Sequence, residues 1–531
     1  MTVLAFVVLA IYTVSLLYIT AYCLLQFNLL YHYQHNPAPA PPAAPPQDAP
    51  VREDQRQCYA SPAGGGSARV AYPPETDVAP ADAPALPFVT VQLPIFNEYY
   101  VIGRLIDAVA AFDYPRDRFE IHVLDDSTDE TVALVAAKVA AYRAQGVRIR
   151  QIIRPHRDGY KAGALRDGMA EARGEFMAIF DADFVPNPQF LRRTIPFFAD
   201  PATGVVQTRW EHLNQDYNLI TRLQALQLNV HFTVEQVGRM KGGHLLQFNG
   251  TAGVWRRAAI EAGGGWQPDT LTEDLDLSIR SQLAGYHIRY LEEVGSPAEL
   301  PVEMNGFKSQ QHRWMKGGAE TARKLLPTVW RSGLATGHKV HATVHLLASS
   351  IFLFVFLCAV FSVPLLFLLG TLAEFGVSKH IFGVFLAGLL SVIAVYYVAN
   401  VRSVANTDPS FFRSVVKFLI LFPLFLALSM GLSLHNSVAV LQGYRGRKSP
   451  FVRTPKFNIN SVADRLRSKR YLSGSLNWIT VGEGLLSLYF LGAVAAGIYL
   501  QNTTFIVFHA LLAVGYGAIF VFSVKDLGLV K

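Results

Sequence analysis

The sequence predicts two structural parts, an α/β domain with a largely parallel sheet and an α-helical membrane region. From Phe88 onward, short β-branched or aromatic runs alternate with segments whose apolar residues recur at helical spacing, the pattern of layered α/β domains. Long apolar segments flank this block on both sides. Of the 531 residues, 51% are hydrophobic and 16% are charged, against about 25% charged in an average soluble domain. We therefore expect an integral membrane protein.

Residues 3–30 form an apolar run that is long enough to cross a bilayer, which takes about 20 residues. The run has no basic segment before it and no small-residue cleavage site directly after it, so it does not have the features of a signal peptide. Residues 1–31 are therefore expected to be a retained anchor, with the N-terminus outside because the nearest arginines follow the run. Residues 32–87 are rich in Pro, Ala and Gly and are expected to form a disordered linker.

Residues 88–340 are expected to form the α/β domain. The predicted strands cover residues 88–93, 119–124, 147–153 and 176–180, and the first two predicted helices cover residues 101–112 and 128–145. Ser127 and Glu130 have the spacing of a capping box for the second helix. Ligands bind at the carboxyl ends of the strands in such sheets. Two acidic clusters, Asp125-Asp126 and Asp181-Ala182-Asp183, are predicted to lie there.

Residues 341–531 return to membrane character. The apolar segments cover residues 344–370, 381–399, 418–441, 479–500 and 505–524. The loop at 443–470 carries nine Lys and Arg against one Asp, which indicates a cytoplasmic loop beside a membrane rather than a nucleic-acid surface. Basic residues also precede the segment 418–441, so both of its ends are expected in the cytoplasm. We therefore expect that segment to be interfacial or re-entrant.

The pair Asp181 and Asp183 is typical of a divalent cation site. Two carboxylates two residues apart at the end of a buried strand suit Mg²⁺ or Mn²⁺, which would neutralise a leaving nucleotide diphosphate. Each acidic motif has an ordinary alternative, because Asp-x-Asp occurs by chance and an Asp-Asp pair often serves as a cap or a solvated turn.

Two further motifs suggest chemistry. Thr272-Glu273-Asp274 begins a predicted helix, where Asp274 could take a proton from an acceptor hydroxyl or simply complement the helix dipole. In Gln310-Gln311-His312-Arg313-Trp314, the indole could stack on a sugar ring while Arg and Gln donate to phosphate oxygens. The alternative is a cation and an aromatic ring at a membrane surface. Lys161 is a further candidate donor to phosphate.

Taken in order, these motifs resemble those of the processive family 2 glycosyltransferases of the cellulose synthase superfamily. The D, DxD, TED and QxxRW motifs of that family match Asp126, Asp181-Asp183, Thr272-Asp274 and Gln310-Trp314. The similarity covers roughly residues 88–525. It is greatest to the plant cellulose-synthase-like mannan synthases and their bacterial relatives, through the stretches at 92–98, 123–129, 248–256 and 310–314.

The resemblance implies a GT-A catalytic domain on the cytoplasmic face and an inverting, single-displacement transfer. It also implies a role for each matched residue. Glu98, Asp125, Asp126, Lys161 and Asp181 would contact the nucleotide, and Asp181 with Asp183 would hold Mg²⁺ or Mn²⁺. Asp274 would be the catalytic base, with Glu273 beside it, and Gln310, Arg313, Trp314 and Asn249 would bind the diphosphate and the acceptor. Phe451, Thr454 and Lys456 would belong to a gating loop within residues 443–476.

Some residues depart from the cellulose synthase pattern. Arg453 stands where that family usually carries Val, and Phe248-Asn249-Gly250-Thr251 replaces a cysteine-containing acceptor motif. These departures put glucose in doubt as the donor sugar. No cyclic-dinucleotide domain is expected after the last apolar segment.

The expected function is polymerisation of a β-1,4-linked hexose polysaccharide from GDP-mannose or UDP-glucose, with the product threaded across the membrane. The alternative is a non-processive lipid glycosyltransferase of the ceramide type. The expected partners are a nucleotide-sugar donor, a growing glycan acceptor and the lipid bilayer, with no nucleic acid. Envelope proteins that export the glycan are possible further partners, and the sequence does not identify them. A bacterial inner membrane, with the catalytic domain in the cytoplasm, is the expected location.

Overall fold

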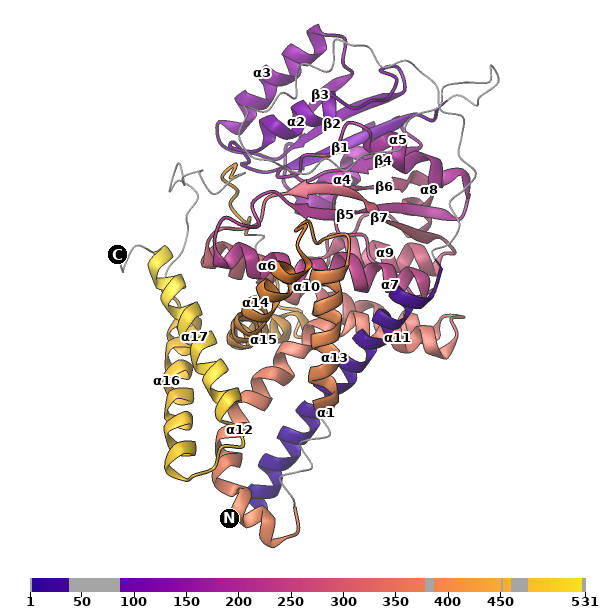
Figure 1. Cartoon of the computed structure of the whole chain (residues 1–531). Coiled ribbons are helices and arrows are strands. Elements are labelled where there is room, and N and C mark those ends of the chain that lie inside the picture. The colour runs from indigo at the N-terminus through magenta and orange to yellow at the C-terminus, as the bar shows by residue number, and fades with distance from the viewer. Residues whose placement is uncertain (1, 38–85, 378–385, 450–451, 460–475, 528–531) are drawn as a thin grey trace.

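Figure 1 shows a domain built around a β-sheet, with long helices extending away from one side of it. The structure is a computed structural model, and it describes residues 2–37, 86–377, 386–449, 452–459 and 476–527. The predicted linker falls mostly at 38–85, outside these residues. The anchor helix α1 (Thr2–His35) continues past the predicted boundary at residue 31.

The central sheet has seven strands in the order β3-β2-β1-β4-β6-β5-β7. The strands are β1 (Val89–Ile95), β2 (Phe119–Asp125), β3 (Ile149–Ile153), β4 (Phe176–Ile179), β5 (Thr203–His212), β6 (Gly253–Arg256) and β7 (His287–Ala298). The four predicted strands are confirmed, and the pairing is largely parallel as expected. Strand β6 is the exception, since it runs antiparallel to both β4 and β5.

Helices cover both faces of the sheet. Helices α2 (Ile102–Ala110), α3 (Thr131–Ala144) and α5 (Phe190–Thr194) pack on one face, where Val91 and Leu93 are fully buried. The other face packs against α4 (Tyr160–Glu171), α6 (Leu219–Val230), α7 (Gln236–Lys241), α8 (Arg257–Ala262) and α9 (Glu273–Leu283). A π-helical turn, η3 (His231–Glu235), joins α6 to α7.

The capping box predicted for α3 is wrong. The helix begins at Thr131, and its N-cap residue Glu130 makes no capping hydrogen bond through its side chain. Ser127 instead serves a loop contact, because its hydroxyl accepts the backbone N–H of Asn97 at 2.9 Å. Its own N–H donates to Asp125 Oδ1 at 2.9 Å. A contact with the loop after β1 therefore replaces the expected cap.

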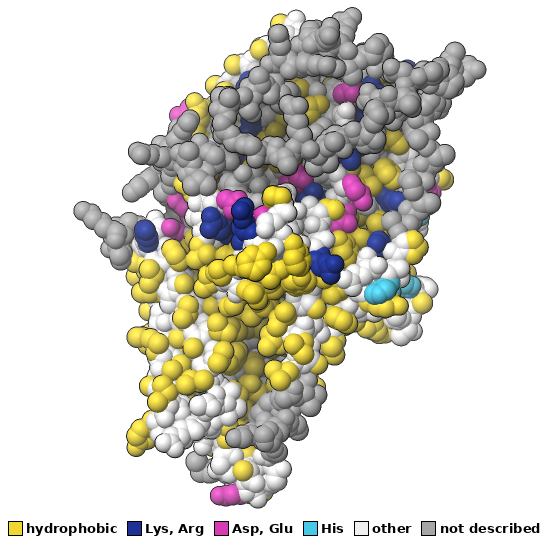
Figure 2. Space-filling view, viewed as in Figure 1, with side chains coloured by type: hydrophobic (Ala, Val, Ile, Leu, Met, Phe, Trp, Pro, Cys, Tyr) yellow, Lys and Arg dark blue, Asp and Glu magenta, His cyan; other side chains and the backbone are white. Residues whose placement is uncertain are grey.

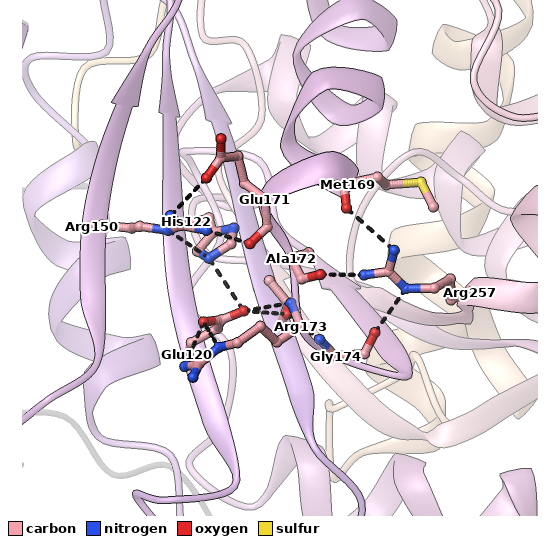
Figure 3. Close-up of polar contacts among 10 residues, drawn as sticks. Glu120, His122, Arg150, Met169, Glu171, Ala172, Arg173, Gly174 and Arg257 are labelled. Carbon is pink, nitrogen blue, oxygen red and sulfur yellow. Dashed lines mark hydrogen bonds and ion pairs between the residues drawn. The ribbon is translucent and has the colours of Figure 1, made fainter.

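A polar cluster ties the segment between α4 and β4 to strands β2 and β3 (Figure 3). Arg173 pairs with Glu120 at 2.9 Å, and Arg150 pairs with Glu171 at 2.9 Å. Arg150 Nε also donates to His122 Nε2 at 3.0 Å. Burial lowers the pKa of His122 to about 4, so the imidazole is neutral at pH 7 and can accept this hydrogen bond.

Arg257 donates hydrogen bonds to the same segment from its other side (Figure 3). Its guanidinium donates to the carbonyl oxygens of Met169, Ala172 and Gly174 at 3.3, 2.5 and 3.1 Å. Both ends of the turn into β4 are therefore held by charged hydrogen bonds, which are stronger than neutral ones. This fixes the start of the strand that leads to Asp181.

The helices on the membrane side include five that are long and apolar enough to cross a bilayer, within the described residues. They cover residues 2–35, 348–374, 411–431, 478–499 and 506–526. Helix α13 (Leu386–Tyr397) is shorter and follows the undescribed residues 378–385. Figure 2 shows hydrophobic side chains spread over this part of the molecule, with Lys and Arg gathered where it meets the sheet domain. Both features fit a membrane-embedded region.

The segment predicted at 418–441 is two helices, α14 (Phe411–Gly431) and α15 (Ser433–Tyr444). Phe418 and Phe422 on α14 pack in one cluster with Leu223 of α6, while Leu419 and Ile420 are exposed. In Figure 1, α14 and α15 lie close beneath α6, whereas α16 (Trp478–Tyr499) and α17 (Ile506–Asp526) extend away from the sheet domain. The interfacial placement of this segment stays a prediction.

A buried ion pair joins the sheet domain's last helix to the membrane helices. Lys308 on α10 (Met304–Arg331) lies 2.6 Å from Glu483 on α16, and the two side chains are 5% and 0% exposed. Removing one partner of such a pair leaves an uncompensated buried charge.

We expect Lys308→Met to lower stability by about 3–5 kcal/mol, because Glu483 would lose its counter-ion inside the protein. The double variant Lys308→Met/Glu483→Leu removes both charges and should recover most of the loss. Thermal unfolding in nanodiscs measures the three proteins side by side. A double variant no more stable than the single one would show that the unpaired charge is not the cause.

Candidate active site

One cavity lies at the carboxyl ends of the central strands and is lined by almost all of the predicted site residues. The lining includes Glu98, Asp126, Lys161, Asp181, Asp183, Asn249, Glu273, Asp274, Gln310, Arg313, Trp314, Thr454 and Lys456. Asp125 does not line it, because this side chain is buried and accepts hydrogen bonds from Ser127 and Gln151. Phe451 lies outside the described residues.

Asp126 follows β2 and is held by an arginine that sequence reasoning missed. Arg154 Nε and Nη2 contact the two carboxylate oxygens of Asp126 at 2.9 and 2.5 Å, a bidentate pairing. Arg157, also missed, lines the cavity and stacks its guanidinium 3.3 Å from the ring centroid of Phe96. Both arginines directly follow β3, at the same edge as the acidic clusters, and that position was the available signal.

Asp181 and Asp183 follow β4 and pair with different lysines. Asp181 Oδ1 lies 2.5 Å from Lys161 Nζ, and Asp183 Oδ2 lies 2.7 Å from Lys456 Nζ. The backbone N–H of Asp181 donates to Thr251 Oγ1 at 2.8 Å, which fixes the turn. Burial raises the pKa of Asp181, although Lys161 opposes the shift. The two lysines thus compensate the negative charges of two carboxylates that lie close together.

The donor set at this turn fits a hard divalent cation. No described residue hydrogen-bonds Asp181 Oδ2 or Asp183 Oδ1, and Glu98 Oε2 is buried without a partner. Oxygen ligands of this kind are the ones that Mg²⁺ and Mn²⁺ prefer. Within the described residues, no group of three or more His, Cys, Asp or Glu is placed to hold an ion unaided. Diphosphate oxygens of a ligand would have to complete the coordination.

Glu273 and Asp274 form the first turn of α9, as predicted from the sequence. Burial raises the pKa of Asp274 to about 7, and the neighbouring charge of Glu273 adds to the effect. Gly250 lies against this carboxylate, since a Cβ added there would come within 3.0 Å of Asp274 Oδ2. Gly250 has a φ of +81°, which also favours glycine. A carboxylate with a pKa near neutrality is well suited to act as a base.

Helix α10 presents one face to the cavity and the other to the membrane helices. Gln310, Arg313 and Trp314 line the cavity. His312 points instead toward α15, where its Nε2 lies 3.2 Å from Gln442 Oε1. Burial lowers the pKa of Arg313 to about 10, so its guanidinium stays charged at pH 7.

Residues 452–459 reach across the cavity. In addition to the Lys456–Asp183 pair, Arg453 Nε lies 3.7 Å from Glu98 Oε1, and the N–H of Phe457 donates to Glu299 Oε1 at 2.8 Å. The cavity has a volume of about 220 Å³, below the roughly 300–1,000 Å³ of typical ligand sites. The segment therefore takes up space that a ligand would need. Glu299 was missed because it belongs to no recognisable motif.

Part of the chain matches a known protein family and curated relatives. Residues 84–317 match the family model described as glycosyltransferase like family 2. Glucomannan 4-beta-mannosyltransferase 2 of Arabidopsis thaliana is 44% identical over 251 residues, which are 46% of this chain and 47% of that protein. Glucomannan 4-beta-mannosyltransferase 1 of Oryza sativa subsp. japonica is 44% identical over 263 residues, 48% of this chain and 50% of that protein.

The chain thus spans about half the length of the curated relatives that it matches. Among solved structures, it is similar to the mannosyltransferase PcManGT from Pyrobaculum calidifontis in complex with GDP-Man and Mn²⁺. The identity is 20% and the TM-score 0.49, and the match covers 74% of this chain and 99% of that one. Residues 84–317 of this chain are therefore similar to the glycosyltransferase like family 2 and contain a GT-A-like mixed sheet.

Proposed function

We propose that this chain is a membrane-embedded hexosyltransferase that builds a β-1,4-linked polysaccharide from a nucleotide sugar. The observation that carries the proposal is the cavity, which is lined by residues of all four acidic and aromatic motifs. The relatives named 4-beta-mannosyltransferases support the linkage and favour GDP-mannose over UDP-glucose as the donor.

The diphosphate of the donor binds between the acidic turn after β4 and α10. Asp181 and Asp183 would hold Mg²⁺ or Mn²⁺, which would neutralise negative charge on the leaving group. Lys161, Gln310 and Arg313 donate to phosphate oxygens. Glu98 and Asp126 contact the rest of the nucleotide. Asp125, which lies behind Asp126, positions the loop rather than touching the ligand.

Asp274 acts as the general base. It takes the proton of an acceptor hydroxyl while the hydroxyl oxygen attacks the anomeric carbon of the donor sugar. The bond from that carbon to the diphosphate breaks on the opposite face, so the configuration inverts. Glu273 keeps the pKa of Asp274 high, and Trp314 stacks on the acceptor sugar.

The membrane helices give the product its route. Helix α10 carries Gln310, Arg313 and Trp314 and also contacts α16 through Lys308, so the acceptor end of the cavity adjoins the membrane region. We assign residues 88–340 to the catalytic domain on the cytoplasmic side, residues 341–531 to the channel and residues 443–476 to the gating loop. The curated relatives are plant proteins, so they do not support the expected bacterial inner membrane.

Asp274→Asn should lower kcat by about 10²–10⁴-fold, the usual contribution of a general base, while nucleotide affinity changes little. Nucleotide release and direct nucleotide binding measure the two effects separately. Asp269→Asn is the matched control, because Asp269 is an exposed carboxylate paired with Lys324 outside the cavity. An Asp274→Asn enzyme with normal turnover would refute the base assignment.

The pH profile should report the same carboxylate. Because burial raises the pKa of Asp274 to about 7, kcat/KM should fall as the pH decreases through about 7 and the base becomes protonated. Glu273→Gln removes the neighbouring negative charge, so the acidic limb should move to lower pH. An unchanged limb in this variant would assign the titration to another group.

A donor panel decides the substrate. Purified protein in nanodiscs is given GDP-mannose, UDP-glucose, UDP-GlcNAc or UDP-galactose with Mg²⁺ or Mn²⁺, and the products are digested with linkage-specific glycanases. We expect a polymer from GDP-mannose that β-mannanase degrades. A cellulase-sensitive polymer from UDP-glucose would make it a glucan synthase, and a single extractable glycolipid would favour the non-processive alternative.

A further inference from the structure

The side chain of Asn249 is held at both ends by residues from the turn between α6 and α7. Asn249 Nδ2 lies 2.7 Å from His231 Nε2, and Asn249 Oδ1 accepts a hydrogen bond from Gln236 Nε2 at 2.7 Å. Asn249 also donates its backbone N–H to Gln207 Oε1 at 2.9 Å. The side-chain amide, which lines the cavity, is therefore fixed by two partners, and the backbone of the same residue is fixed by a third.

At the first end of this chain of hydrogen bonds, Glu235 determines which ring nitrogen of His231 carries the hydrogen. Its Nδ1 lies 2.9 Å from Glu235 Oε2. Burial would raise the pKa of Glu235, but Arg239 and His231 outweigh it and hold that pKa below its ordinary value. An ionised carboxylate can only accept, so Nδ1 of His231 carries the hydrogen. In the Nδ1–H tautomer Nε2 is an acceptor, which matches the amide nitrogen of Asn249 at 2.7 Å.

The second end fixes the opposite side of the amide. Gln236 is fully buried, and its Nε2 also donates to the backbone carbonyl of Gln247 at 2.7 Å. A carbonyl can only accept, so Gln236 must keep its nitrogen on this side. Its second N–H then requires an acceptor, which is Asn249 Oδ1. Reversing the amide of Asn249 would bring two donors together at one end, so a single orientation satisfies both ends.

The backbone supplies this arrangement through an unusual turn. His231 and Glu235 are the first and last residues of the π-helical turn η3, and Gln236 begins α7. Single π-helical turns between α-helices are rare and frequently occur at functional sites. The turn and the start of α7 bring His231 and Gln236 to the side chain of Asn249, and they place Glu235 against the ring of His231.

This orientation leaves one N–H of Asn249 Nδ2 without an acceptor among the described residues. The amide and the base line the same cavity, and Gly250, the residue after Asn249, packs against Asp274. We propose that His231, Glu235 and Gln236 are positioning residues that aim this N–H at a hydroxyl of the sugar held beside Asp274. The inference rests on the proposed function, since a sugar must occupy the cavity.

The kinetic test is a cycle between enzyme variants and substrate analogues. The donor and acceptor sugars are compared with analogues that lack one hydroxyl each, for the wild type, Asn249→Ala, His231→Leu and His231→Gln. In the wild type one analogue should lose about fivefold in kcat/KM, the effect of one neutral hydrogen bond. That loss should vanish in Asn249→Ala and His231→Leu, because the donor is absent or misdirected.

His231→Gln is the conservative control, since its amide oxygen can accept the hydrogen bond of Asn249, and it should retain the discrimination. A purely structural role for His231 would lower kcat/KM by the same factor for every analogue, which would overturn the proposal. A wild type that tolerates the loss of each hydroxyl equally would also overturn it.

A second measurement does not depend on activity. In protein with ¹⁵N-labelled histidine, magic-angle-spinning NMR should show His231 protonated at Nδ1 and unprotonated at Nε2, with its signal identified by loss in His231→Gln. Protonation at Nε2 would overturn the proposed orientation whatever the enzyme transfers. If no donor yields a product while the Nδ1–H tautomer is observed, the proposed function fails and the orientation of Asn249 stands.

Discussion

The balance of charge in the cavity is the constraint on which the site depends. Several carboxylates converge there, and burial alone would protonate or separate them. Lysines from two distant segments prevent this, since Lys161 at the start of α4 pairs with Asp181 and Lys456 pairs with Asp183. The rigid sheet then determines which acids meet these cations, because β4 delivers the acidic turn and the charged hydrogen bonds of Arg257 hold the approach to that strand.

Local pattern was enough to predict the elements that carry the motifs. The strands before Asp125 and Asp181 and the helix that begins at Glu273 were all found from apolar spacing. The capping box failed because Ser127 serves Asn97, a residue about 30 positions earlier in the chain. Strands β5, β6 and β7 were missed, and the antiparallel pairing of β6 with β4 and β5 joins segments that local spacing does not relate.

The supporting residues of the site were also beyond local reasoning. Glu299 and His231 are part of no recognisable sequence motif. Each supports the site by a hydrogen bond to a residue in another segment of the chain. In the membrane region, hydropathy located the apolar segments, but the break between α14 and α15 depends on packing. A Cβ on Gly431 would come within 2.5 Å of the backbone of Gly515 on α17, so the helices cross there at backbone contact.

The contact between Lys456 and Asp183 couples cation binding at the turn after β4 to the position of residues 452–459. An oxygen that pairs with an ammonium group is a poorer ligand for a cation, so Lys456 and a cation would compete for Asp183 Oδ2. Thermodynamic reciprocity then applies: whatever factor the Lys456–Asp183 pair removes from cation affinity, a bound cation removes from the stability of that pair. A single ion pair thereby links the position of residues 452–459 to the occupancy of the cavity.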